Sequence, residues 1–202
     1  GHRDPPARHL PDDAGFEQPV VVKLPVPPAE RRWLRALQPA GDVAPRLYCD
    51  GDSIGGYDIA WVVMERLPHG PLSNAWDGAE FDLVIEAACR FALAAYAVPI
   101  DAQPPQRDWP ALVKQARQNV RRDGFPLAQR WTQALKKAQK KLTGWLDVWA
   151  AHPPAEWRHG DLHMGNALTR EAPPGGPAFL IDYARTCPGH WVEDAVYFEH
   201  LY

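Results

Sequence analysis

The sequence predicts an α+β fold in which a small β-rich part precedes a larger helical part. Two observations predict it. Short runs of β-branched and aromatic residues, bounded by turn residues, occur in the first third of the chain. Longer segments with apolar residues at helical spacing occupy much of the region from residue 81 to residue 149.

The first third contains two predicted strands and one predicted helix. Gln18–Leu24 carries three consecutive valines before Lys23 and is closed by Pro25, which predicts a strand that ends at Lys23. Pro27–Leu37 begins with prolines, which suit a first helical turn, and continues with apolar residues at helical spacing. Tyr57–Met64 follows a turn-rich segment and predicts another buried strand.

Three helices are predicted after residue 80. Phe81–Val98 has apolar residues at helical spacing and stops before Pro99. Trp109–Arg122 and Leu127–Trp149 are amphipathic, and both are followed by turn residues. Tryptophans form a stripe on the last helix and are expected to pack in the core, because aromatic side chains dominate helix interfaces. They are Trp131, Trp145 and Trp149.

The composition is typical of a globular intracellular protein. The 202 residues are 46% hydrophobic and include nine tryptophans, enough for a real core. Three widely spaced cysteines indicate neither a disulfide framework nor a zinc site, so a cytoplasmic location is expected. The N-terminus lacks a signal pattern, and charged residues interrupt the most apolar segment, Leu83–Val98, so no membrane partner is expected. The net charge of −3 gives no case for nucleic acid as a partner.

The most informative polar residues lie in two short stretches, from His159 to Asn166 and from Leu180 to Tyr183. Phosphoryl transfer needs a carboxylate that accepts the proton of the attacking hydroxyl, and oxygen ligands for a Mg²⁺ ion that bridges the phosphates. The turn-rich segment Arg170–Pro177 predicts a hairpin that returns the second stretch beside the first. The groups that such chemistry requires are then supplied by Asp161, Asn166 and Asp182.

The pattern His-Gly-Asp-x-His-x-x-Asn, followed by Ile-Asp-Tyr, resembles that of the aminoglycoside phosphotransferase and choline kinase group of small-molecule kinases, relatives of the protein kinases. The resemblance implies a bilobal protein-kinase-like fold, with ATP and Mg²⁺ as cofactors. It makes Asp161 the catalytic base and Asn166 and Asp182 the Mg²⁺ ligands. It also places His163 where protein kinases have a phosphate-facing lysine, whereas His159 is expected to brace the loop through backbone contacts.

The resemblance also assigns a nucleotide-binding pair in the N-terminal part. Lys23 is expected to hold the α- and β-phosphates, positioned by Glu30 from the following helix. The alternative is that Lys23 is a solvated residue at a strand end and that Glu30 only complements the helix macrodipole.

Met64 to Leu67 resembles the hinge of the kinase superfamily. Met64 would guard the adenine pocket, and the main chains of Glu65 and Leu67 would bond the base. The alternative is an ordinary junction between a strand and a loop. A hinge here divides the chain into an N-lobe of residues 1–67, with the nucleotide lysine, and a helical C-lobe of residues 68–202, with the catalytic and metal-binding loops.

The chain departs from the family pattern at both ends. The 22 residues before Lys23 contain no glycine-containing nucleotide loop, so this loop is expected to be missing or reduced. Gly189 to Ala195 resembles a family motif in which an aspartate, here Asp194, braces the catalytic loop. The helices that often complete the acceptor pocket in the family do not follow this motif. Ala184 replaces the glycine of the protein-kinase Asp-Phe-Gly motif, which argues against a protein substrate.

The function expected is ATP-dependent transfer of the γ-phosphoryl group to a hydroxyl of an aminoglycoside, a sugar or an amino alcohol. The alternative is a non-catalytic kinase-like protein that binds nucleotide or acts as a scaffold. The segment from residue 101 to residue 156 contains ten basic and five acidic residues, and this excess of positive charge favours a neutral or anionic acceptor. The alternative is that these residues only form a solvated surface. The acceptor, the preference for ATP over GTP and the oligomeric state stay undetermined at this level.

Overall fold

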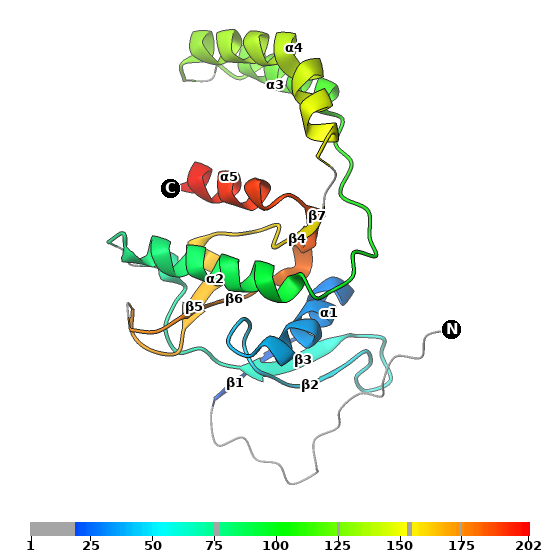
Figure 1. Cartoon of the computed structure of the whole chain (residues 1–202), viewed down its shortest axis with the longest axis vertical. Coiled ribbons are helices and arrows are strands. Elements are labelled where there is room, and N and C mark those ends of the chain that lie inside the picture. The colour runs from blue at the N-terminus through cyan, green and yellow to red at the C-terminus, as the bar shows by residue number, and fades with distance from the viewer. Residues whose placement is uncertain (1–18, 75–76, 125, 153–154, 174) are drawn as a thin grey trace. The chain divides into compact units, whose positions relative to one another are not determined.

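The computed structural model describes residues 19–74, 77–124, 126–152, 155–173 and 175–202. The chain divides into two compact units, one of Gly1–Gln103 with Ala155–Tyr202 and one of Pro104–Pro154. Figure 1 shows the helices and strands of both units. The boundaries of these units differ from the predicted lobes of residues 1–67 and 68–202, and the division into lobes stays a prediction.

The first unit begins with a three-stranded antiparallel sheet in the order β1-β3-β2. Its strands are β1 (Val20–Lys23), β2 (Leu47–Gly51) and β3 (Trp61–Glu65). The valines of β1 favour extended backbone, and the register places Lys23 opposite Val62. The predicted strand Tyr57–Met64 was wrong in its first half, because Tyr57 and Ile54 exchange backbone hydrogen bonds in a tight turn.

Helix α1 (Pro28–Leu37) follows β1 and packs near β2 (Figure 1). Prolines precede and begin the helix, as predicted, because the first helical turn has no need of their missing N–H groups. Trp33, Leu34 and Leu37 are almost completely buried on one face, and this face joins the main hydrophobic core. Glu30 lies in the first turn and is also buried, which brings a carboxylate to the sheet.

Helix α2 (Ala79–Ala95) contributes a second face to the same core. Its buried residues Val84, Ala87, Phe91 and Ala95 recur at helical spacing, so a helix here was predicted correctly. The apolar face expected from the sequence ran through Ile85, Cys89 and Tyr96 and was wrong, because these side chains are exposed. The helix ends three residues before the predicted Val98. It packs against β6 (Ala178–Leu180), the strand that leads into the polar stretch Leu180–Tyr183.

The C-terminal part of the first unit is made of short strands and one helix. Strand β4 (Glu156–Arg158) pairs with β7 (Cys187–Gly189), and β5 (Ala167–Thr169) pairs with β6 (Ala178–Leu180), both antiparallel. Helix α5 (Trp191–Leu201) follows. Single 3₁₀ turns occur at Gln38–Ala40, Leu72–Asn74, Met164–Asn166 and Tyr183–Arg185.

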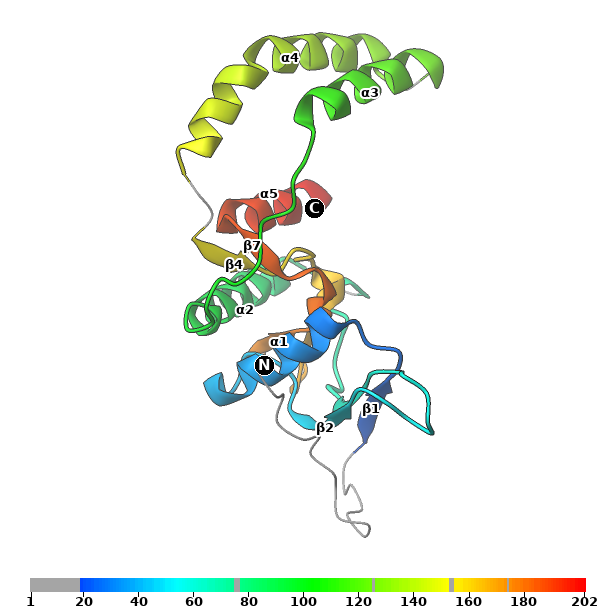
Figure 2. The same cartoon turned by 90° about the vertical axis from the view of Figure 1, so that its right-hand side faces the viewer.

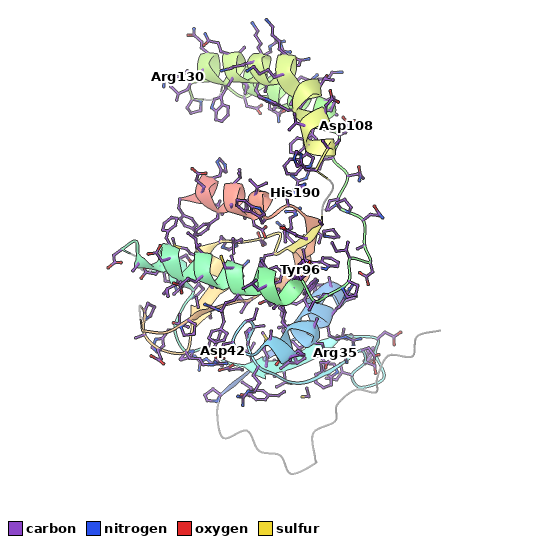
Figure 3. The ribbon with its side chains drawn as sticks, in the orientation of Figure 1. Arg35, Asp42, Tyr96, Asp108, Arg130 and His190 are labelled. Atoms are coloured by element: carbon purple, nitrogen blue, oxygen red, sulfur yellow. The ribbon has the colours of Figure 1, made fainter. Side chains whose placement is uncertain are left out.

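The second unit is a helical hairpin of α3 (Trp109–Arg122) and α4 (Ala128–Ala150), which lie side by side (Figure 2). Asp108 caps α3 by accepting a hydrogen bond from the backbone N–H of Ala111 at 2.9 Å, and Figure 3 shows its place at the start of that helix. Among the described residues of the two helices, Val120 alone is fully buried.

The expectation that the tryptophan stripe of α4 packs in the core was wrong. Trp131, Trp145 and Trp149 are 49%, 52% and 42% exposed. In a two-helix hairpin each helix packs against one other helix, so the apolar surface of α4 is only partly covered within its unit. Across the described part of the chain, no helix combines the length and the apolar character that crossing a membrane requires.

Candidate active site

The loop from His159 to Asn166 is fixed by a buried histidine. The Nδ1 atom of His159 accepts a hydrogen bond from the backbone N–H of Asp161 at 3.3 Å, so Nε2 carries the proton and donates to the carbonyl of Ile181 at 3.1 Å. Burial lowers the pKa of this imidazole to about 4. The neutral ring therefore links the loop to the segment that carries Asp182, in agreement with a bracing role.

Helix α5 holds the same loop from another side. The carboxylate of Asp194 accepts hydrogen bonds from the backbone N–H groups of His159 at 2.6 Å and Gly160 at 2.9 Å. Burial raises the pKa of Asp194, although these two bonds oppose the rise. Gly160 has a φ of +82°, and a Cβ atom there would lie 2.3 Å from the carbonyl oxygen of Arg185. The loop therefore has little freedom to move.

The carboxylate of Asp161 is 17% exposed at the end of this braced loop. One of its oxygens, Oδ1, has three side-chain neighbours, of which the hydroxyl of Tyr197 is within hydrogen-bond distance. The hydroxyl of Tyr197 donates to it at 3.2 Å, Nη1 of Arg185 lies 3.6 Å away, and Nε2 of His163 lies 3.9 Å away. Asp161 is thus oriented by groups from three separate elements.

The β5–β6 hairpin brings the two predicted metal ligands together. The backbone N–H of Ile181, next to Asp182, donates to the carbonyl of Asn166 at 3.0 Å. The side-chain Nδ2 of Asn166 donates to the backbone carbonyl of Asp161 at 3.0 Å, which fixes the amide so that its oxygen points away from this bond. Asp182 has a left-handed backbone with a φ of 63°, and its side chain is 42% exposed.

These donors suit a Mg²⁺ ion that is shared with a bound nucleotide. Among the described residues, no three His, Cys, Asp or Glu side chains gather closely enough to hold a metal by themselves. Mg²⁺ commonly takes one or two protein oxygens and completes its shell with phosphate and water oxygens. An amide oxygen from Asn166 and a carboxylate from Asp182 fit that pattern.

The predicted nucleotide-binding pair, Lys23 and Glu30, lies beside Asp182, the second predicted Mg²⁺ ligand. The ammonium group of Lys23, at the end of β1, donates to both carboxylate oxygens of Glu30 at 2.8 and 2.7 Å. The same Nζ atom lies 3.5 Å from Oδ1 of Asp182. Lys23 is 37% exposed, whereas the Glu30 carboxylate is buried, so the pair offers its cationic end to solvent beside Asp182. The structure therefore favours the paired arrangement over two independent surface residues.

The three predicted hinge residues lie at the end of β3 and just beyond it. Met64 and Leu67 are both buried. The backbone N–H of Glu65 already donates to the carbonyl of Arg46 at 2.8 Å. No contact within the chain tests whether these residues bind a base, so that role stays a prediction.

The side chain of Glu65 has a structural partner that the sequence did not reveal. Arg170, in the turn of the β5–β6 hairpin, donates to its two carboxylate oxygens at 2.6 and 2.9 Å and also contacts Asp42 at 2.6 Å. The hydrogen bond from Arg170 lowers the pKa of Glu65, and the pKa of Arg170 is raised in turn. This ion pair connects the end of strand β3 to the β5–β6 hairpin, whose ends adjoin the predicted metal ligands Asn166 and Asp182.

Two residues next to Asp161 were also absent from the sequence-based site. Arg185 lies three positions after Asp182, in the 3₁₀ turn that follows it, and Tyr197 lies one helical turn after Asp194. The sequence shows that Arg185 follows Asp182 by three positions and that Tyr197 follows Asp194 by three positions. Nothing in the residue types showed that both side chains would reach the same carboxylate oxygen.

This arrangement, with a lysine–glutamate pair from a small sheet and its helix next to a braced catalytic loop and a two-ligand hairpin, is that of the kinase-like phosphotransferases. The model of the phosphotransferase enzyme family matches residues 8–198, and the chain belongs to this family. No curated protein matches the chain.

Solved structures support the fold. The chain is similar to an aminoglycoside phosphotransferase from Alicyclobacillus acidocaldarius, with a TM-score of 0.60 and 17% identity over 90% of this chain and 61% of that one. It is also similar to an aminoglycoside phosphotransferase from Streptomyces rimosus in complex with ADP and streptomycin, with a TM-score of 0.51 and 20% identity over 89% of this chain and 70% of that one. These likenesses confirm the predicted α+β kinase-like fold. The chain spans 61% of the length of the first of these structures.

The predicted missing or reduced glycine loop concerns the residues before Lys23, and residues 1–18 lie outside the described part of the chain. That prediction stays as it was made.

Proposed function

We propose that the chain transfers the γ-phosphoryl group of ATP to a hydroxyl of a small molecule. The observation that carries the proposal is the convergence of Lys23 on both Glu30 and Asp182, since it joins the predicted phosphate-binding pair to the predicted metal loop. A lysine that a buried glutamate positions next to a metal-ligand aspartate is the arrangement that phosphate binding requires. Membership of the phosphotransferase family supports the same reaction class.

Each residue has a defined part in the proposed reaction. Asp161 accepts a hydrogen bond from the acceptor hydroxyl and takes up its proton as the new O–P bond forms. Lys23, held by Glu30, binds the α- and β-phosphates. Asn166 and Asp182 would hold Mg²⁺, which supplies positive charge to the phosphate oxygens.

The remaining predicted residues complete the nucleotide site in this proposal. His163, 3.9 Å from Asp161, would face the transferred phosphoryl group. Met64 would border the adenine pocket, with Leu67 offering main-chain groups to the base. Because the N–H of Glu65 is already bonded to Arg46, its contact with the base would fall to its carbonyl oxygen. The partner is a small alcohol, and the proposed location is the cytoplasm.

Calorimetry and turnover together test this proposal. ATP should bind with Mg²⁺ present and bind more weakly after chelation of the metal. An ATP-consumption screen across sugars, aminoglycosides, choline-like amines and amino-acid alcohols should find at least one acceptor. Asp161→Asn should lower kcat by about 10²- to 10⁴-fold, because it removes the proton acceptor, while the Kd for ATP changes little.

The matched control is Asp147→Asn, which makes the same change on the exposed surface of α4. It should leave kcat within about twofold of the unmodified chain. Nucleotide binding without turnover on any alcohol would instead identify a non-catalytic nucleotide-binding protein.

A further inference from the structure

The place where an acceptor hydroxyl must bind is surrounded by positive charge and hydrogen-bond donors. A hydroxyl that gives its proton to Asp161 has to reach a carboxylate oxygen, and Oδ1 is the oxygen on which other groups converge. Those groups are the hydroxyl of Tyr197, the guanidinium of Arg185 and the imidazole of His163. None of the three is acidic, so the neighbours of Oδ1 add no negative charge to that of Asp161 itself.

Arg185 is the strongest of these determinants. Its side chain is 70% exposed, so its N–H donors are accessible to a ligand. Within the described part of the chain, its one ion pair is with Asp161, at a distance of 3.6 Å that is too long for a good hydrogen bond. Its backbone is fixed, because the 3₁₀ turn that contains it lies against Gly160 of the catalytic loop.

An exposed guanidinium in a fixed position beside a catalytic carboxylate is suited to bind an anion. Arginine presents a planar fork of donors that matches the two oxygens of a carboxylate or phosphate group. While Arg185 faces Asp161, it also competes with an incoming hydroxyl for Oδ1. An acidic group on the acceptor would draw the guanidinium away from Oδ1 and make room for the acceptor hydroxyl beside the hydrogen bond from Tyr197.

We propose that the acceptor is an alcohol that carries a carboxylate or phosphate group close to the hydroxyl that is phosphorylated, and that Arg185 binds this acidic group. The inference rests on the proposed phosphotransferase function and specifies its substrate class. The acceptor O–H bond breaks, and its proton passes to Asp161. The new bond joins the acceptor oxygen to the γ-phosphorus of ATP, the bond from that phosphorus to the bridging oxygen breaks, and ADP leaves.

Turnover on four charge-sorted groups of alcohols tests the inference in the full chain. The first group contains hydroxy acids and sugar acids such as glycerate and gluconate, and the second contains sugar phosphates and glycerol phosphate. The third contains neutral polyols and sugars, and the fourth contains ethanolamine, glucosamine and streptomycin. ATP consumption should be highest in the first or second group, and the group that responds shows which acid is recognised.

Variants of Arg185 connect the preference to this side chain. Arg185→Gln should raise KM for the acidic acceptor by about ten- to a hundredfold, since a charged hydrogen-bonded contact is lost. KM for ATP and the turnover of any neutral acceptor should change less than about threefold. Arg185→Lys should recover part of the affinity, because it restores the charge without the fork.

A matched control removes another exposed arginine from an ion pair. Arg32→Gln breaks the 2.9 Å contact between helix α1 and Asp101, which involves none of the predicted site residues, and should leave turnover on all four groups of alcohols unaffected. Highest turnover on neutral or cationic alcohols, or an unchanged KM in Arg185→Gln, would overturn the inference and leave the phosphotransferase function intact. Mg²⁺-dependent ATP binding without turnover on any of the four groups would overturn both.

Discussion

The catalytic loop and the α3–α4 hairpin differ in what they bury. In the loop, the polar residues His159 and Asn166 are buried, and the His159 ring bonds to the carbonyl of Ile181 while the Asn166 amide bonds to the carbonyl of Asp161 within the loop. In the hairpin, the described residues include one buried apolar side chain, Val120, while Trp131 and Trp145 are about half exposed. One region hides polar groups and the other exposes apolar ones.

The difference shows what a sequence pattern can specify. A buried polar group is costly without its partner, so the spacing of polar residues in a motif implies particular contacts. An amphipathic helix needs only some apolar neighbour, and its periodicity does not say which one. The motif therefore predicted the geometry of the loop, whereas the helical pattern predicted a helix and not its packing.

The largest expected effect comes from comparing Trp157, in the strand β4 that leads into the loop, with Trp145 of the hairpin. Trp157 is 5% exposed, packs edge-on against Trp33 at 5.0 Å between ring centroids, and donates from Nε1 to the carbonyl of Val98 at 2.9 Å. Trp157→Ala should lower the free energy of unfolding by about 3–5 kcal/mol, because it leaves a cavity and an unpaired carbonyl. Trp145→Ala should cost less than about 1 kcal/mol.

Urea titration followed by circular dichroism measures both variants without relying on tryptophan fluorescence. If Trp145→Ala is as destabilising as Trp157→Ala, the tryptophan stripe of α4 has a packing partner, and the contrast between the two regions fails.

The helices were easier to predict from the sequence than the strands. The bounds of α3 were predicted correctly, and α1 and α4 within one residue, because their apolar periodicity is local. Strand β2 was missed, since Leu47–Gly51 contains no β-branched residue and ends in a turn-like Asp-Gly pair. The pairing of this strand with β3 is what makes it a strand.

The candidate site shows the same limit. The predicted loop, hairpin and lysine–glutamate pair come together in the structure, because each depends on residue types at short and fixed spacing. The contacts of Arg170 with Glu65 and of Arg185 with Asp161 were not predicted. An arginine on a loop has many possible acidic partners, and only the folded chain selects one of them.

The second largest expected effect is a pH dependence of stability that arises from the buried His159 of the loop. Burial lowers the pKa of His159 from 6.5 to about 4, so the folded chain keeps this ring neutral where the unfolded chain protonates it. The unfolded state then binds more protons between these two values. The free energy of unfolding should therefore fall as the pH drops through this window, by about 3 kcal/mol in total for this group.

Urea titrations at several pH values, repeated on His159→Gln, isolate this contribution. The variant should be less stable at neutral pH and show a flatter dependence between pH 6.5 and pH 4. His152→Gln, which changes an exposed histidine beyond the end of α4, is the matched control for the substitution itself. An equal slope in His159→Gln would show that the buried ring is not the group that titrates with unfolding.

The smallest expected effect concerns the orientation of the catalytic carboxylate. Tyr197→Phe removes the 3.2 Å hydrogen bond to Asp161 and leaves the ring in place. A lost hydrogen bond of ordinary strength corresponds to a two- to tenfold change, about 1 kcal/mol, so kcat should fall by this factor while KM for ATP stays the same. Steady-state kinetics on an identified acceptor measure the two constants separately.

Tyr96→Phe is the matched control, because Tyr96 is 86% exposed at the end of α2 (Figure 3). An unchanged kcat in Tyr197→Phe would mean that Asp194 and His159, which hold the backbone of the loop, are sufficient to orient Asp161. A fall in kcat would show that α5 acts twice on the loop, since Asp194 fixes its backbone and Tyr197, one helical turn later, orients Asp161, the proposed proton acceptor.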